Sequence, residues 1–290
     1  MRNLQNLFIF VCGFLLKCYN VIIMKRKISI SDAPILEWDD DHAEESKNYF
    51  FAQGKKNFSA FKECQALSID KCIIFYPRAF SECKEIFNKC EKIYEFKSAS
   101  TVSPVYLYDK KLLIALCPLG GPASANLLEE LHFVGITKFI ACGSCGCIVD
   151  GVDIDGLFFV PTSAIRDEGL SYHYVPASRF IETNTFVNLA LEKSLQKHNQ
   201  PYITGTTWTI DALYRETPNR TKRRIQEGAI GVEMECASLA SVAEYNKFYF
   251  GELLYFTDKV DEKNWRWRIY DKISLRTKLL KICIDAILTL

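Results

Sequence analysis

This 290-residue chain has little excess of charge of either sign, few paired metal ligands and few long apolar runs. Its 36 basic and 35 acidic residues leave a net charge of +1, so no global field attracts nucleic acid or an anionic membrane. The four histidines lie far apart, and Cys142, Cys145 and Cys147 form the only tight group of cysteines. Zinc sites commonly need four ligands in two spaced pairs. We therefore expect reduced thiols in a cytoplasmic protein, and no metal.

The N-terminal segment is apolar but short. The run from Leu7 to Leu16 cannot span a bilayer, and no A-x-A-like cleavage site follows it. We expect residues 1–23 to be a leader or an over-extended start rather than a functioning signal, and we expect no membrane partner. Residues 24–70, which include an acidic, polar stretch, are expected to form an N-terminal arm.

Nucleotide-binding fingerprints are also absent. The glycines match neither a nucleotide-triphosphate loop nor a dinucleotide fingerprint, and spacing alone identifies no Ser–His–Asp or Cys–His arrangement. Hydrophobic residues make up 49% of the chain and charged residues 24%, as in ordinary globular proteins. Function therefore has to be argued from the ends of the predicted strands.

Strands and helices are predicted to alternate from residue 71 to the C-terminus. "KCIIFYP" indicates a strand, residues 79–92 a helix, and "TKFIACGSCGCI" a buried strand that runs into a glycine-rich loop. Such alternation predicts an α/β sheet with helices on both faces. Ligands of such sheets bind at the carboxyl ends of strands. The ends "GSCG", "RDEG", "TWTID", "VEME" and "FTD" are therefore expected to form one site.

Two acids of "GVEMECASLA" stand where a buried strand runs into a buried helix. Glu233 and Glu235 are two residues apart, so they share a face of an extended segment. One is expected to cap the following helix, since carboxylates favour helix N-termini. The other, for which we favour Glu235, is expected to accept hydrogen bonds from two sugar hydroxyls.

The remaining strand ends carry weaker signals. Asp258 follows the apolar "LLYFT", where desolvation favours a general acid, although a turn cap is an equally ordinary role for Asp. The aromatic and polar residues of "TWTIDALYRETP" suit a planar ring, but a packed strand followed by a capped helix explains them as well. Gly143 and Ser144 of "ACGSCG" offer backbone N–H groups to an anion.

Taken in order, six segments resemble the nucleoside phosphorylase family, which includes uridine phosphorylases, purine nucleoside phosphorylases and related nucleosidases. The segments are "GGPASANLLEEL", "KFIACGSCG", "AIRDEGLSYHYVP", "TWTIDALYRETP", "GVEMECASLASVAEY" and "LLYFTDKV". The resemblance covers residues 71–290. It implies a single α/β domain with a mixed, partly barrel-like sheet flanked by helices, a homo-oligomer (a dimer or a trimer of dimers), and cleavage of the bond between ribose and base.

The resemblance also implies roles for individual residues. Glu235 would hold the ribose hydroxyls and Asp258 would protonate the leaving base, which makes these two the candidate catalytic residues. The candidate substrate-binding residues are Glu233, Met234, Trp208, Thr209, His173, Gly143, Ser144 and Arg78. Met234 would pack against the sugar, Glu233 would border the base, and Trp208 and Thr209 would lie against it. No cofactor is implied beyond inorganic phosphate as co-substrate.

The phosphate elements depart from the family pattern. An Arg usually stands two residues before the glycine of "GSCG", and here that residue is Ala141. The family's "GDPxR"-like loop corresponds to "IIFYPRAF", which keeps only Arg78. Phosphate needs fixed cationic donors. Either Arg78, Lys138 or a neighbouring subunit supplies them, or the enzyme uses water. A nucleoside-binding protein without catalysis is the third possibility.

Overall fold

A computed structural model describes residues 33–37, 61–76, 80–99, 101–260, 265–267 and 272–290. The chain divides into two units, Met1–Asp39 and Asp40–Leu290. In the first unit the described part is a 3-10 turn, η2, at Pro34–Leu36. The expected leader (1–23), much of the expected arm (24–70), and Arg78 lie outside the described residues.

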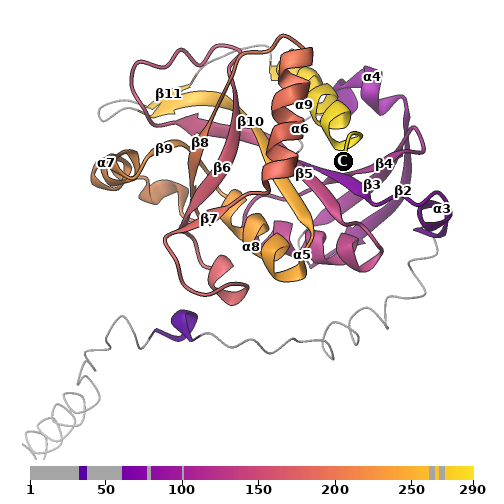
Figure 1. The fold of residues 1–290 in the computed structure, drawn as a ribbon, viewed down its shortest axis with the longest axis horizontal. Coiled ribbons are helices and arrows are strands. Elements are labelled where there is room, and N and C mark those ends of the chain that lie inside the picture. Colours follow the sequence, from indigo (N-terminus) through magenta and orange to yellow (C-terminus); the bar gives the residue numbers. More distant parts are fainter. Residues whose placement is uncertain (1–32, 38–60, 77–79, 100, 261–264, 268–271) are drawn as a thin grey trace, which may run out of the picture. The chain divides into compact units, whose positions relative to one another are not determined.

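In the second unit the described residues form an eleven-stranded sheet with helices against it (Figure 1). The strands are β1 (Lys71–Phe75), β2 (Cys90–Lys97), β3 (Val102–Tyr108), β4 (Leu112–Leu116), β5 (Lys138–Cys147), β6 (Phe158–Asp167), β7 (Phe180–Glu182), β8 (Tyr202–Ile210), β9 (Ala229–Glu233), β10 (Tyr249–Val260) and β11 (Trp265–Trp267). The α-helices are α3 (Lys62–Ala66), α4 (Lys84–Phe87), α5 (Gly121–Phe133), α6 (Thr185–Lys197), α7 (Pro218–Gln226), α8 (Cys236–Asn246) and α9 (Lys272–Ile287). Short 3-10 turns are η4 (Phe80–Glu82), η5 (Ser171–His173) and η6 (Leu213–Arg215). The predicted α/β class is confirmed.

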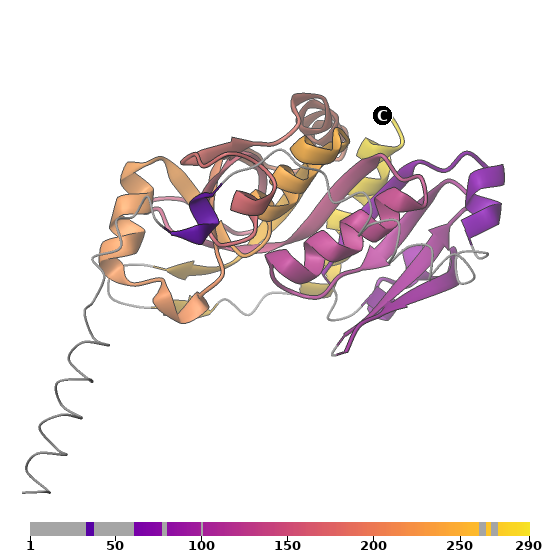
Figure 2. The ribbon, with the colours of Figure 1, turned by 90° about the horizontal axis from the view of Figure 1, so that it is seen from below.

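Part of the sheet closes into a barrel. The strands β5, β9, β8, β6 and β10 are neighbours in this order, each paired with the next. Strand β10 completes the ring by pairing with β5. Strand β10 runs parallel to β5, whereas β9 runs antiparallel to it. The strands β1, β4, β3 and β2 extend the sheet outward from β5, and Figures 1 and 2 show them at one end of the domain. The expected mixed, partly barrel-like sheet is therefore confirmed.

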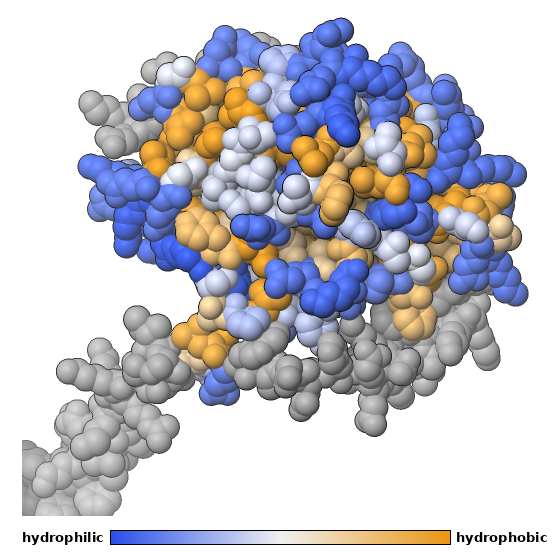
Figure 3. All heavy atoms as spheres, viewed as in Figure 1, coloured by the Kyte–Doolittle hydropathy of each residue, from blue (hydrophilic) through white to orange (hydrophobic). Residues whose placement is uncertain are grey.

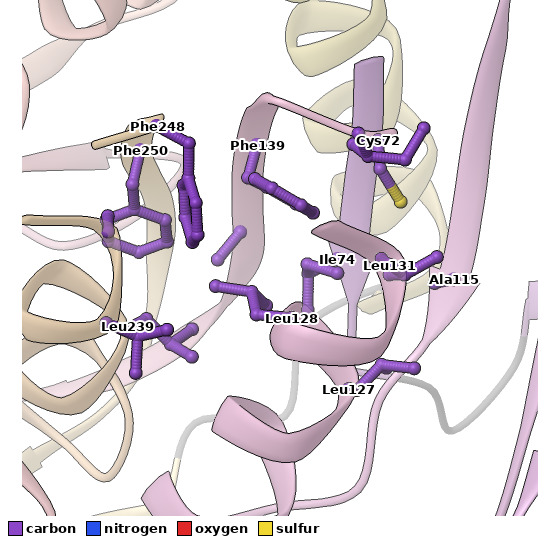
Figure 4. Packing of buried hydrophobic residues seen from close by; sticks show 14 of the residues in the cluster. Cys72, Ile74, Ala115, Leu127, Leu128, Leu131, Phe139, Leu239, Phe248 and Phe250 are labelled. Atoms are coloured by element: carbon purple, nitrogen blue, oxygen red, sulfur yellow. The ribbon is translucent and has the colours of Figure 1, made fainter. Parts of the chain in front are cut away.

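Side-chain alternation along the strands separates two layers of core. The face drawn in Figure 3 mixes hydrophilic and apolar residues, whereas the interior in Figure 4 is apolar. In β1, Cys72 and Ile74 face the cluster that contains α5 and α8, whereas Ile73 and Phe75 face α9. Because successive strand residues point to opposite faces, a strand covered on both sides must be apolar throughout. This explains the continuous apolar run "CIIF".

Two local expectations are wrong. The helix predicted over residues 79–92 is only the short η4 and α4, because from Cys90 the chain pairs as β2 with β3. The "GSCG" stretch is not a loop, because β5 continues through it to Cys147. Strand β5 stays extended there because β10 pairs with it along its whole length, from Lys138 to Cys147.

Candidate active site

A pocket opens where two strands part from the same edge of β5. On that edge β1 pairs with residues 138–142 and β9 with Gly146 and Cys147. Between them, residues 143–145 have no strand partner on this edge within the described part of the chain. A pocket of about 460 Å³ lies at this gap. Its polar lining includes Tyr76, Ser144, Glu216, Glu233, Glu235, Tyr255, Thr257, Asp258 and Arg276.

Glu233 ends β9 and is fully engaged by hydrogen-bond donors. Its Oε2 accepts from the backbone N–H groups of Glu235 and Cys236, at 2.6 and 2.7 Å. Its Oε1 accepts from the hydroxyls of Thr209 and Thr207, at 2.6 and 3.3 Å. Burial raises the pKa of Glu233, and these four donors oppose the rise. The prediction that one of the two acids caps the helix is confirmed, and that acid is Glu233.

Glu235 lines the same pocket but is held at one point. Its Oε1 accepts from the backbone N–H of Gly120 at 2.5 Å. Gly120 has φ 95°, a conformation that favours glycine, and Gly121 packs so tightly on the side chain of Ser238 that a Cβ would not fit. Gly120 therefore serves the contact with Glu235, and Gly121 serves the close packing of α5 on α8. Burial, followed by the charge of Glu233, raises the pKa of Glu235 to about 8.

Asp258 lies near the end of β10 and is 6% exposed. The hydroxyl of Thr257 donates to its Oδ1 at 2.5 Å. Asp258 lines the pocket together with Met234, Gly143 and Ser144. The structure thus brings "VEME", "GSCG" and "FTD" together, as the sequence predicts.

Three other candidates lie elsewhere. Trp208 is fully buried, its Nε1 donates to Asp167 at 2.9 Å, and it does not line the pocket. Its ring belongs to a buried cluster with Ile165 and Val232, and the guanidinium of Arg224 on α7 lies 5.6 Å from it. The expected contact with a base stays a prediction. Thr209 is also buried and supports Glu233 instead of reaching the pocket. His173 is exposed on η5, outside the pocket lining.

The expected meeting of all five strand ends is therefore only partly correct. "RDEG" does not line the pocket, and "TWTID" reaches it only through residues that follow β8. Lys138, one suggested phosphate donor, is the first residue of β5 and pairs with Asp70 at 2.8 Å. It is not among the pocket residues.

Two charged pocket residues were missed by the sequence analysis. Glu216 follows η6, and burial, then the charge of Asp258, raises its pKa to about 7. Arg276 on α9 is the one Lys or Arg among the described lining residues, and its Nε donates to the hydroxyl of Tyr255 at 3.3 Å. The "YRETP" segment was a signal for Glu216. The amphipathic pattern of the last helix gave none for Arg276.

Comparison with known proteins agrees with this fold. The chain matches the Phosphorylase superfamily over residues 79–289 and belongs to it. The family resemblance inferred from the sequence is therefore confirmed.

Curated relatives match over shorter stretches. The chain is 28% identical to a uridine phosphorylase of Haemophilus influenzae, over 38% of this chain and 43% of that protein. It is 34% identical to a uridine phosphorylase of Thermococcus kodakarensis, over 33% of this chain and 34% of that protein. It is 28% identical to a guanosine phosphorylase of Halorubrum lacusprofundi, over 46% and 54%. Each match thus spans about half of the relative's length or less.

Cysteines and helices add two findings. All ten cysteines in the described residues are free thiols. Cys142 belongs to the core beneath α9, whereas Cys145 and Cys147 belong to a separate cluster inside the barrel.

Among the helices that the structure describes, none is long and apolar enough to cross a bilayer.

Proposed function

We propose that this protein cleaves the N-glycosidic bond of a nucleoside by phosphorolysis, releasing the free base and ribose 1-phosphate. The observation that carries the proposal is the position of Glu235. It is a carboxylate that is only 6% exposed, lines the pocket, and has one oxygen held by Gly120. Two ribose hydroxyls that donate to this group favour its ionised form, which then holds them through charge-assisted hydrogen bonds.

The other pocket residues fit the remaining steps. As the C1′–N bond breaks, its electron pair goes to the base and positive charge develops on the sugar. Asp258, in the same pocket, supplies a proton to the leaving base. A phosphate oxygen then forms the new bond to C1′. Met234 packs against the sugar, and Glu233 fixes the segment that carries Glu235.

Arg276 supports phosphate as the nucleophile. Ala141 is fully buried in the position where phosphorylases have an Arg, so the charge must come from elsewhere. Arg276 lines the pocket with Gly143 and Ser144, and an Arg suits the recognition of phosphate. Arg78 remains a second proposed donor. If neither binds phosphate, Ala141 favours the alternative, a nucleoside hydrolase that uses water.

A homo-oligomer, a dimer or a trimer of dimers, in the cytoplasm is part of the proposal. Large apolar side chains are exposed close to the pocket, since Leu119 is 74% exposed and Tyr214 is 92% exposed. A partner subunit that covered them would remove apolar surface from water.

The test is release of free base from a panel of nucleosides, with and without phosphate. We expect phosphate-dependent release by the unaltered protein. Glu235→Gln should lower kcat/KM roughly 100-fold, since hydrogen bonds to a charged group are lost, and its melting temperature should show that it folds. Glu91→Gln, on exposed β2, is the matched control.

Three outcomes would count against parts of the proposal. Release at the same rate without phosphate would establish the hydrolase. Nucleoside-induced thermal stabilisation without any turnover would establish a binding protein. Near-normal activity of Glu235→Gln would refute the ribose role.

A further inference from the structure

Glu168 of the "RDEG" segment is a buried acid outside the pocket, and the proposed function gives it no role. It is 7% exposed. Its Oε2 accepts from the backbone N–H groups of Leu170 and Ser171, at 2.7 and 3.1 Å. The same oxygen accepts from the hydroxyl of Ser238 on α8 at 2.7 Å. The first two bonds close the turn that contains Glu168, whereas the third ties that turn to a helix 70 residues later in the chain.

The other charged residues of this segment are bonded to different elements. Arg166 donates to Ser171 and to the carbonyl oxygen of Val175, within the loop that follows β6. Asp167 accepts from Arg224 on α7. A buried acid is unfavourable unless it is bonded, so Glu168 holds α8 where Ser238 can reach it.

Ser238 in turn supports the start of α5. It lies three residues after Glu235, and Gly121 packs so tightly on its hydroxyl that a Cβ would not fit between them. Gly121 also borders the carbonyl oxygen of Met234. The first residue of α5 is thus seated on the segment that carries the proposed sugar-binding acid.

The seat of α5 determines where the donor to Glu235 lies. Gly120 directly precedes α5, and its backbone N–H donates to the Oε1 of Glu235 at 2.5 Å. Behind this contact, apolar residues of α5 and α8 pack in one cluster, which includes Leu128 and Leu239 (Figure 4). The two helices therefore place Glu235 and its donor relative to one another.

We propose that Glu168 is a positioning residue that orients Glu235 toward the ribose through Ser238 and the glycines at the start of α5. It touches no ligand itself. Without its carboxylate, Ser238 loses its acceptor, α5 loses its fixed seat, and the N–H of Gly120 shifts relative to Glu235. A misplacement of about 1 Å by a change far from the chemistry can cost roughly 100-fold in rate. The inference rests on the proposed function, in which Glu235 holds the ribose hydroxyls.

Ribonucleosides and their 2′-deoxy counterparts provide the experiment, because the deoxy sugar lacks one hydroxyl that Glu235 would hold. Uridine is compared with 2′-deoxyuridine, and inosine with 2′-deoxyinosine. For the ring class that is used, we expect kcat/KM of the unaltered protein to favour the ribonucleoside roughly tenfold or more, since the deoxy sugar makes one charge-assisted bond fewer.

Glu168→Ala should reduce that ratio to within about threefold. Glu168→Gln should retain it, because the amide oxygen can still accept from the same donors. A simple loss of folded protein lowers the two rates equally and leaves the ratio unchanged. The ratio therefore separates a positioning role from a merely structural one.

Two serines on α8 provide a matched control. Both hydroxyls are buried, but Ser238 donates to Glu168, whereas Ser241 donates to the carbonyl oxygen of Ala237 in its own helix. Ser238→Ala should reduce the ratio as Glu168→Ala does, and combining the two should reduce it no further. Ser241→Ala should leave it unchanged. Additive losses in the combined variant would overturn the inference. Ser238→Ala supplies the same test if Glu168→Ala does not fold.

Binding separates this inference from the proposed function. The same four nucleosides are titrated calorimetrically against the unaltered protein, Glu168→Ala, Ser238→Ala and Ser241→Ala. A preference for the ribonucleoside that Glu168→Ala and Ser238→Ala lose and Ser241→Ala keeps supports the inference even if no nucleoside is cleaved, in which case only the proposed function fails. An unchanged preference in the folded variants, or no preference in the unaltered protein, would overturn the inference, whether or not nucleosides are cleaved.

Discussion

Individual carboxylates in and behind this pocket differ in how fully they are bonded. Glu233 is saturated by four donors, Glu235 is held by one, and Glu216 has none in the described residues. A fourth acid, Glu252 on β10, lies behind them and is 1% exposed. Its Oε2 has no hydrogen-bond partner in the described residues. These differences separate acids that maintain the fold from acids that are available to a ligand.

Glu252 should make the protein less stable at high pH. Burial, followed by the charge of Glu233, raises its pKa well above the ordinary carboxyl value. The folded state therefore retains a proton that the unfolded chain releases above about pH 4.3. Stability is full below that pH and falls as pH rises toward the folded-state pKa.

Glu252→Gln, which cannot ionise, should weaken this pH dependence. We expect its melting temperature at pH 9 to exceed that of the unaltered protein by roughly 5 °C, with little difference at pH 4. Thermal unfolding followed by circular dichroism at both pH values is the measurement. If the melting temperatures of the two proteins changed with pH in the same way, Glu252 would not contribute to the pH dependence of stability.

At the scale of elements, the start of α8 depends on a side chain that precedes it. Glu233 satisfies two backbone N–H groups at this helix terminus and joins them to β8 through Thr207 and Thr209. Glu233→Ala leaves these buried donors unpaired. We expect a loss of about 3 kcal/mol in the free energy of unfolding.

Glu233→Gln should recover part of that loss, since its amide oxygen can still accept from the two N–H groups. Urea unfolding of both variants measures the difference. Equal stability of Glu233→Ala and the unaltered protein would mean that water replaces the carboxylate as the cap.

The sequence predicted elements where local chemistry decides them. The strand "KCIIFYP" and the strand–helix junction at Glu233 both have local signals, and both are present. The length of β5 could not be predicted from local sequence signals. Its extended "GSCG" depends on pairing with β10, more than 100 residues later in the chain. Likewise, β2 forms over Cys90–Lys97 because β3 pairs with it.

The site was predictable to a similar extent. Residues next to one another in the chain, such as Glu233, Met234 and Glu235, do line one pocket, and their roles toward a ligand stay predictions. The direction of the Trp208 side chain could not be predicted, because it depends on how α7 packs against the end of β8. Arg276 was missed because only the packing of α9 against the sheet brings it to the pocket.

At the scale of the whole domain, α9 contributes the pocket's Arg to strands that lie far from it in the sequence. If Arg276 binds phosphate, Arg276→Ala should raise the KM for phosphate roughly tenfold or more, the loss expected for a charge-assisted hydrogen bond. The KM for the nucleoside should change much less.

Lys278→Ala, an exposed position on the same helix, is the control. Initial rates over a range of phosphate concentrations provide the measurement. Unchanged phosphate dependence in Arg276→Ala, with a normal melting temperature, would move the proposed role to Arg78.

The pocket between β1 and β9 is built from residues that the ribosome synthesises at very different times. The pocket residues extend from Phe75 to Arg276, so a growing chain on the ribosome contains the strand β5 long before it contains β10 and α9. Domains acquire long-range pairings slowly and late. A nascent chain can therefore hold Glu235 outside the ribosome while the wall that carries Asp258 is still missing from the pocket. The pocket is therefore complete only once α9, which carries Arg276, has been released.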